Sequence, residues 1–236
     1  MWESRVLFID GEALVIDKPP GLAVHPGPRT PASLEDHLRH LRFGFQRPPS
    51  PVHRLDRDTS GCLLLSRHPN AHKRFARAFG EGAVAKTYLA VVAGVPEAEE
   101  GVIDLPLHKI TSREEGWRVV VDDERGKRAV THWRRLTVSN GRSLLLFSPE
   151  TGRTHQLRVH AAEGLGLPIA GDPIYGPSTS SGQERQGPML LHARSLRMER
   201  EGKQPIEAIA PLPPSFPHAG FPDLDVGDAG SGDAGD

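Results

Sequence analysis

Short apolar runs separated by turn residues make up most of the chain. Two strands are expected within residues 5–18, where Asp10-Gly11 is typical of a tight hairpin turn. Three or four strands are expected within 102–147. Alternating or continuous apolar positions predict the strand segments at 62–66, 86–92, 117–121, 129–136, 143–148, 190–193 and 205–210.

Helical spacing of apolar residues is confined to three segments, at 34–42, 71–80 and 155–164. Ser33 and Asn70 can cap the first two, and Gly164 can end the third. Strands outnumber helices and do not alternate with them regularly. We therefore expect an α+β fold with a largely antiparallel mixed sheet.

Charge is distributed unevenly along the chain, although the net charge is only -1. Residues 219–236 contain five aspartates and no Lys or Arg, so the remainder carries about +4 by the same count. Residues 29–77 hold ten Arg or Lys against four Asp or Glu. Such an excess can neutralise phosphates, and it is equally typical of a solvated basic face.

The same composition predicts location and domain organisation. The lone cysteine, Cys62, lies in an apolar run and indicates a reducing compartment. No apolar stretch approaches the ~20 residues of a membrane span, and the first residues lack the pattern of a signal peptide. We expect a soluble, cytoplasmic protein with one catalytic domain over 1–217 and a disordered acidic tail over 218–236.

A first polar cluster, at residues 53–61, precedes an apolar strand. Its Asp56 has Arg54 and Arg57 close by in sequence, and positive neighbours favour the ionised form of a carboxylate. An ionised carboxylate can act as a nucleophile or a base at neutral pH. A loop rich in Asp, Thr, Ser and Gly also suits a turn that only satisfies its own backbone.

Two further clusters lie at 151–160 and 168–176. In the first, Arg153 can form a two-point salt bridge with a carboxylate. His155 and His160 are spaced poorly for one metal site, and we expect no metal. The second cluster suits a fixed structural loop. Nucleotide-binding glycine motifs are absent from the sequence, so we expect no cofactor.

Taken in order, six motifs resemble the RluA-type pseudouridine synthase family, over about residues 5–216. The resemblance implies the pseudouridine synthase fold, with helices and loops around a central RNA-binding cleft. The matching segments are residues 17–26, 53–61, 86–94, 151–160, 171–176 and 191–193.

The resemblance also implies roles for individual residues. Asp56 would be the catalytic aspartate, Arg153 the arginine that pairs with it, and Tyr88 the ring that packs on the target base. Further contacts to the base or the RNA are expected from Arg54, Leu157, His25, His155 and Gln156.

The implied reaction isomerises uridine in structured RNA, ribosomal or transfer, without a cofactor. The nucleotide is flipped out, the bond from ribose to the base nitrogen is cleaved, and the base is rejoined through carbon 5. Catalytic motifs begin almost at once, so we expect a short form without an N-terminal RNA-binding module. We also expect a monomer with no obligate protein partner.

Two other functions fit parts of the sequence. A non-catalytic RNA-binding or ribosome-assembly protein could keep the fold, although it would not need Asp56, Tyr88 and Arg153 together. A glycosidase could use Asp56 and Asp58 as paired carboxylates, but the Arg-rich clusters would then have no purpose.

Overall fold

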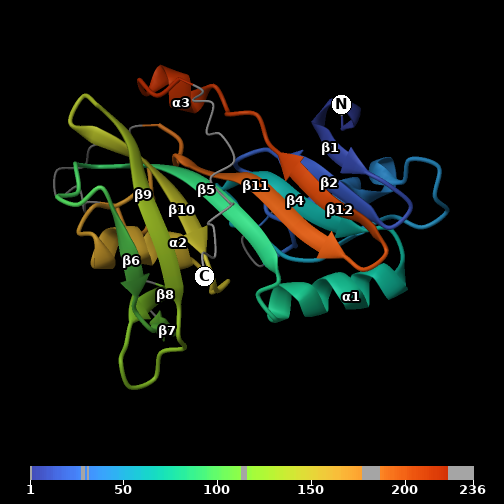
Figure 1. Cartoon of the computed structure of the whole chain (residues 1–236), viewed down its shortest axis with the longest axis horizontal. Helices are drawn as coiled ribbons and strands as arrows, with labels where there is room; N and C mark the ends of the chain where they lie inside the picture. The colour runs from blue at the N-terminus through green and yellow to red at the C-terminus, as the bar shows by residue number, and fades with distance from the viewer. Residues whose placement is uncertain (1, 28–29, 31, 113–115, 177–186, 223–236) are drawn as a thin grey trace, which may run out of the picture.

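The computed structural model describes residues 2–27, 30, 32–112, 116–176 and 187–222 (Figure 1). Strands account for most of the regular structure in these ranges. They are β1 (Val6–Ile9), β2 (Ala13–Lys18), β3 (Ser50–Pro51), β4 (Ser60–Ser66), β5 (Val84–Val92), β6 (Glu100–Asp104), β7 (Leu107–Ser112), β8 (Gly116–Val121), β9 (Val130–Ser139), β10 (Arg142–Pro149), β11 (Leu191–Arg200) and β12 (Lys203–Ile209).

One large sheet forms the body of the molecule. Its main order is β1-β2-β4-β11-β5-β10-β9-β6, with β12 paired to β11 and β3 to β4. Within the described chain, β4 and β11 pair in parallel, and the other neighbours in this sheet pair antiparallel. The α+β fold with a largely antiparallel mixed sheet is confirmed.

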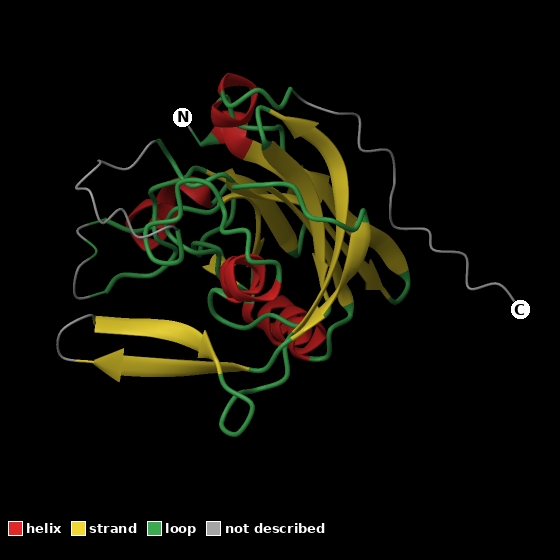
Figure 2. Cartoon of the chain, turned by 90° about the vertical axis from the view of Figure 1, so that its left-hand side faces the viewer, coloured by secondary structure: helices red, strands yellow, loops and turns green. Residues whose placement is uncertain are grey.

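The remaining strands, β7 and β8, form a separate hairpin that projects from the body (Figure 2). With β6, β9 and β10 they give five strands over the stretch for which three or four were predicted. Strands β6 and β7 are short and rich in polar residues, so their alternation gives a weak signal.

Helical segments are short, except for α1 (Pro69–Gly80). The others are η1 (Glu3–Arg5), η2 (Leu34–Leu41), α2 (Gln156–Val159), η3 (His160–Gly164) and α3 (Ser215–His218). The first predicted helix is a 3-10 helix, η2, which begins with a capping box between Ser33 and Asp36. Helix α1 is capped by His68 in place of Asn70, because Pro69 occupies its first position.

The predicted helix at 155–164 is divided into two parts. His155 has a left-handed backbone (φ 54°), so α2 begins only at Gln156. Residues His160–Gly164 then form a π-helix, η3, closed by the Leu165 N–H on the His160 carbonyl. The single regular helix expected from apolar spacing is therefore wrong in geometry, although its limits are close.

The centre of the sheet brings three distant segments together. Gly61 of β4 pairs with Ala193 of β11, and Ala193 pairs with Tyr88 of β5. Gly61 has a φ of +102°, and a Cβ there would lie 2.2 Å from the Ala193 carbonyl oxygen. Only glycine permits this close approach of two backbones. It places the loop before β4 beside Tyr88.

The C-terminal part of the described chain packs on the sheet. Phe216 and Phe221 are buried in one apolar cluster with Leu89 and Val91 of β5. The burial of Phe221 holds the chain to the body beyond residue 217, the limit that was predicted for the catalytic domain. The rest of the predicted tail, 223–236, lies outside the described residues. No helix in the described ranges is both long and apolar enough to cross a bilayer.

Substituting Gly61 should destabilise the fold. We expect Gly61→Ala to lower the free energy of unfolding by about 3 kcal/mol or more, because the new methyl group collides with the Ala193 backbone. Gly141→Ala is the control, since Gly141 also has a positive φ (+70°) but open space around its Cβ position. That variant should lose only about 1 kcal/mol. Equal losses in urea denaturation would contradict the role of the close approach.

Acid should weaken the fold through the fully buried His192, which contacts Ser60 Oγ and the Ala210 carbonyl. Burial lowers the pKa of His192 from 6.5 to about 4. Between these values the unfolded chain binds the proton and the native protein does not, so stability falls as pH falls. Over this range His192 should lower the free energy of unfolding by about 1.4 kcal/mol for each pH unit. His192→Gln should flatten the decline between pH 6.5 and 4 in urea titrations, whereas replacing exposed His218 should not.

Candidate active site

Asp56 lies in the loop between β3 and β4, and buried groups on both sides fix that loop. Leu55 is packed into the core, and the Thr59 N–H donates to the Asp56 carbonyl in a turn. The Lys18 ammonium group at the end of β2 donates to the carbonyls of Pro19, Leu22 and Arg57. These bonds tie two loops together behind Asp56.

Lys18 is fully buried, and burial lowers the pKa of its ammonium group to about 7. The nearby carboxylates of Asp56, Asp58 and Asp17 oppose this shift without cancelling it. With three carbonyl acceptors, the ammonium group has its hydrogen-bonding capacity filled. Lys18 therefore organises the backbone around Asp56.

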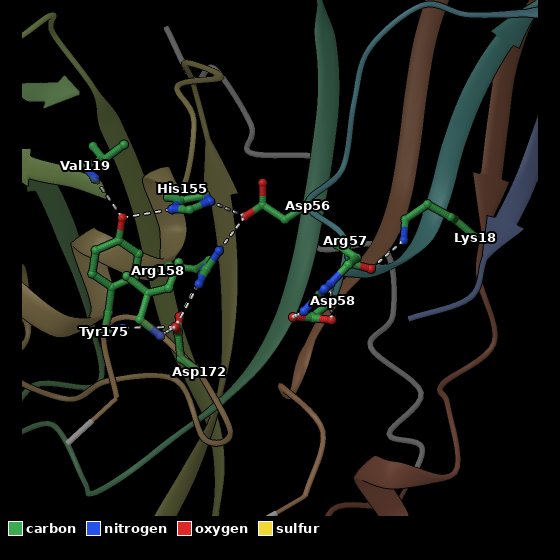
Figure 3. A network of polar contacts seen from close by, with 10 residues as sticks. Lys18, Asp56, Arg57, Asp58, Val119, His155, Arg158, Asp172 and Tyr175 are labelled. Atoms are coloured by element: carbon green, nitrogen blue, oxygen red, sulfur yellow. Dashed lines mark hydrogen bonds and ion pairs between the residues drawn. The ribbon is translucent and has the colours of Figure 1, made fainter. Parts of the chain in front are cut away.

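Arg158 of α2 holds two carboxylates at once (Figure 3). Its Nε and Nη2 donate to Asp172 Oδ2 and Oδ1 at 2.7 and 2.8 Å, and its Nη1 donates to Asp56 Oδ2 at 3.1 Å. The Arg158 side chain is only 5% exposed and that of Asp172 is fully buried. A two-point pair of this kind fixes the guanidinium plane and thus its third arm.

The electrostatics of this network favour full ionisation of Arg158 and Asp172. Burial alone would lower the pKa of Arg158, but the charges of Asp172 and Asp56 raise it above its ordinary value. Burial alone would raise the pKa of Asp172, whereas Arg158 and the backbone N–H groups of Ile174 and Tyr175 lower it. A charged Arg158 thus faces Asp56.

A cleft of about 150 Å³ opens in front of Asp56. Tyr88 of β5 and Leu157 of α2 line it with an aromatic ring and an apolar side chain, and exposed Arg54 lies at its edge. Burial, with the charge of Asp56, raises the pKa of the Tyr88 phenol, so Tyr88 is neutral. The walls suit a flat, uncharged ring.

The two carboxylate oxygens of Asp56 differ in their hydrogen-bond partners. Oδ2 accepts from Arg158 and lies 3.7 Å from His155 Nε2. Among the described residues, no group donates to Oδ1. The site thus offers a fixed carboxylate with one unoccupied oxygen beside a cleft for a planar ligand, which suits a nucleophile or a general base.

A family model described as RNA pseudouridylate synthase matches residues 12–163. An uncharacterized RNA pseudouridine synthase of Zymomonas mobilis is 60% identical over 218 residues, which are 92% of this chain and 98% of that protein. The chain belongs to the RNA pseudouridylate synthase family. It is therefore an isomerase that forms pseudouridine in RNA.

Solved structures and longer relatives agree with this assignment. Human RNA pseudouridylate synthase domain containing 4 superposes on the synthase with a TM-score of 0.78, 27% identity and 92% of each chain covered. Ribosomal large subunit pseudouridine synthase D of Nitrosomonas europaea is 39% identical over 82% of this chain and 57% of that protein. The fold predicted from the sequence resemblance is confirmed.

The predicted pairing of Arg153 with Asp56 is wrong in this structure. Arg153 is exposed before α2 and its Nε donates to the Arg128 carbonyl, whereas Arg158 makes the ion pair with Asp56. Arg153 precedes α2, as it preceded the predicted helix at 155–164, and the left-handed residue His155 lies between Arg153 and the helix. Arg153 still lines the cleft of the synthase, where it can meet RNA.

Two other predicted RNA contacts have different positions. Gln156 is buried, and its amide oxygen accepts from Thr151 Oγ1 and the Arg153 N–H. Its amide nitrogen donates to the Val130 carbonyl and Thr131 Oγ1, so no group is left for RNA. His25 is exposed, contacts Glu35 at 2.6 Å, and is not among the residues that line the cleft.

Sequence reasoning missed three residues that organise the site of the synthase: Arg158, Asp172 and Lys18. All three lie in the motifs that carried the resemblance. A charged residue within an otherwise apolar or tightly turned motif is itself a signal, because burial of such a group requires a partner. Asp172 was assigned to a structural loop, and its ion pair with Arg158 makes that loop part of the site.

Substitutions should distinguish the role of Arg158 from that of Arg153. We expect Arg158→Met to lower the free energy of unfolding by about 3–5 kcal/mol, because it leaves Asp172 buried without a partner. We expect Arg158→Lys, which keeps the charge, to fold but to lose at least about 100-fold in synthase activity, because one ammonium group cannot hold both carboxylates.

Arg153→Met is the matched control. It should change stability by less than about 1 kcal/mol and mainly weaken RNA binding, because Arg153 is exposed and touches no carboxylate of the site. Unfolding in urea and initial rates on RNA measure both effects. If Arg153→Met abolished turnover while Arg158→Lys left it intact, the assignment from geometry would be overturned.

Proposed function

We propose that this synthase isomerises uridine in ribosomal or transfer RNA, with Asp56 as the catalytic residue. The observation that carries the proposal is the fixed carboxylate of Asp56, with Oδ2 bound by Arg158 and Oδ1 open to the cleft. Tyr88 and Leu157 would hold the flipped base against it. Arg54, at the cleft edge, would occupy the space that the base leaves in the RNA.

The reaction uses protein side chains alone. Asp56 promotes cleavage of the bond between ribose carbon 1 and the base nitrogen. The uracil ring then rotates in the cleft and forms a new bond from carbon 5 to the same ribose carbon. The proton on carbon 5 is lost and the freed nitrogen gains one, so the overall reaction is an isomerisation. An apolar, partly enclosed wall favours retention of the detached base.

A larger cleft next to the first supports RNA as the ligand. It measures about 780 Å³ and shares Tyr88 with the smaller one. Its cationic lining residues are Arg54, Lys86, Arg128 and Arg153. The carboxylates there are engaged, Glu81 by Arg77 and Glu150 by His132 and by Arg128 itself, so Arg54, Lys86 and Arg153 are the main candidates for phosphate contacts. Phosphates flanking the target uridine would bind here, so affinity should fall steeply with salt.

The choice of ribosomal or transfer RNA rests on similarity. Relatives named ribosomal large subunit pseudouridine synthases D and C, from Nitrosomonas europaea and Haemophilus ducreyi, match 82% and 84% of this chain. Large-subunit ribosomal RNA is therefore the first substrate to test. A map of pseudouridines in cellular RNA with and without the gene identifies the position. Similarity to bacterial proteins also supports a cytoplasmic enzyme.

Asp56→Asn should abolish pseudouridine formation and leave RNA binding within about threefold of the wild type. The substitution keeps the size of the side chain but removes the charge and the nucleophilic oxygen. Pseudouridine in the RNA and the dissociation constant at fixed salt measure the two effects. Continued modification by the variant would disprove the assignment of Asp56.

Asp58→Asn is the matched control two residues away. Asp58 pairs with the exposed side chain of Arg57, so its loss should reduce the rate by less than about tenfold. Equal loss in both variants would favour a mechanism with two carboxylates. A wild-type protein that binds RNA tightly and modifies none would instead favour the RNA-binding protein.

A further inference from the structure

His155 faces Asp56 from an unusual backbone position. Its φ of 54° and ψ of 17° are left-handed, which is rare and unfavourable for a residue other than glycine. The residue is nonetheless buried, and its Nε2 lies 3.7 Å from Asp56 Oδ2. This backbone conformation turns the ring toward Asp56, so the strain has a visible consequence at the reacting group.

The opposite ring nitrogen of His155 contacts Tyr175. The Val119 N–H of β8 donates to Tyr175 Oη at 3.0 Å, and Tyr175 Oη lies 2.8 Å from His155 Nδ1 (Figure 3). Since the phenol oxygen already accepts one bond, its own hydrogen is free to donate to Nδ1. A neutral imidazole that accepts at Nδ1 carries its hydrogen on Nε2.

Charge at the site favours the same tautomer. If Nδ1 carried the hydrogen, the lone pair of Nε2 would point toward the Asp56 carboxylate and repel it. Burial lowers the pKa of His155 to about 4, so the ring is neutral near pH 7. Neutral His155 thus presents an N–H group to the same oxygen that Arg158 binds.

The hairpin β7–β8 fixes the ring from the side. The indole of Trp117 packs on it with centroids 4.8 Å apart, and Tyr175 meets it edge-on at 5.6 Å. Trp117 and Val119 both belong to β8, so one strand outside the main sheet provides a ring contact and the first hydrogen bond of the chain. The ring can neither flip nor tilt without breaking these contacts.

We propose that His155 is a positioning residue that orients Asp56 through its Nε2–H group, and that Tyr175 and β8 fix this tautomer. The proposal rests on the proposed function, since Asp56 is the group positioned. A distance of 3.7 Å is too long for a hydrogen bond in the free enzyme. Such contacts commonly shorten when substrate binds, and the shortened bond would lock Asp56 Oδ2 while Oδ1 reacts.

Nitrogen-15 NMR of the histidine-labelled full chain tests the tautomer without any activity measurement. The His155 signals are identified by their absence in His155→Gln. We expect the Nε2–H form in the wild type and a mixture of both forms in Tyr175→Phe, because the donor to Nδ1 is then missing. An Nδ1–H form in the wild type would overturn the proposal, whether or not Asp56 proves catalytic.

Steady-state kinetics on RNA test the consequence for turnover. Tyr175→Phe should lower kcat about tenfold and leave KM unchanged, as expected for one lost hydrogen bond that acts on the reacting group. The matched control is Ser66→Ala, which removes a hydroxyl group 3.0 Å from His72 Nδ1 outside the site. This control should keep the wild-type kcat. Similar values of kcat for the two variants would contradict the positioning role.

Two variants at residue 155 distinguish positioning from packing. The amide of His155→Gln can still donate toward Asp56, whereas His155→Leu fills space but donates nothing. We expect the glutamine variant to be at least about tenfold faster than the leucine variant at the same KM. Equal rates in correctly folded variants would indicate that the ring only fills space. If Asp56→Asn stayed active, the proposed function would fail while the NMR result still stood.

Discussion

The buried ion pair between Arg158 and Asp172 is the constraint on which the site depends. Removing two charges from water is costly, and only good geometry and filled hydrogen bonds compensate for it. Asp172 meets this condition with two bonds from Arg158 and two from backbone N–H groups. Since the guanidinium group is rigid, its remaining nitrogen points at Asp56. Arg158 thus transmits the geometry of the Asp172 loop to Asp56, which lies 102 residues before Arg158 in the chain.

The positions of most strands could be predicted from the sequence because they depend on local pattern, whereas the site motifs were identified by resemblance to a family. Apolar runs such as Cys62-Leu63-Leu64-Leu65 define a buried strand wherever they lie. Asp56, Tyr88 and Leu157 were expected at one site, and the structure places all three around one cleft. Their roles in turnover stay predictions that the variants above can test.

The sequence pattern could not predict the partner of Asp56, because two arginines lie in one motif. The backbone conformation decides which of them faces Asp56. A left-handed residue at 155 precedes α2; Arg158 within the helix is buried, and Arg153 before it is exposed. The spacing of apolar residues does not predict a left-handed backbone conformation at a residue other than glycine. The roles of Gln156 and buried Lys18 could not be predicted for a similar reason, since each has at least one partner carbonyl in a distant segment.

The parallel pairing of β4 with β11 has a consequence for how the enzyme is made. Ser60 and His192, which meet across this pair, are 132 residues apart, and β11 lies between β4 and β5 in the finished sheet. During synthesis the ribosome releases the loop with Asp56 long before the strand that separates it from Tyr88. Because a domain generally folds as a unit, the two halves of the sheet can assemble only once the strand that joins them has been made. A chain that ends before β11 therefore lacks the strand that joins the Asp56 loop to Tyr88, and the cleft can assemble only after β11 has been made.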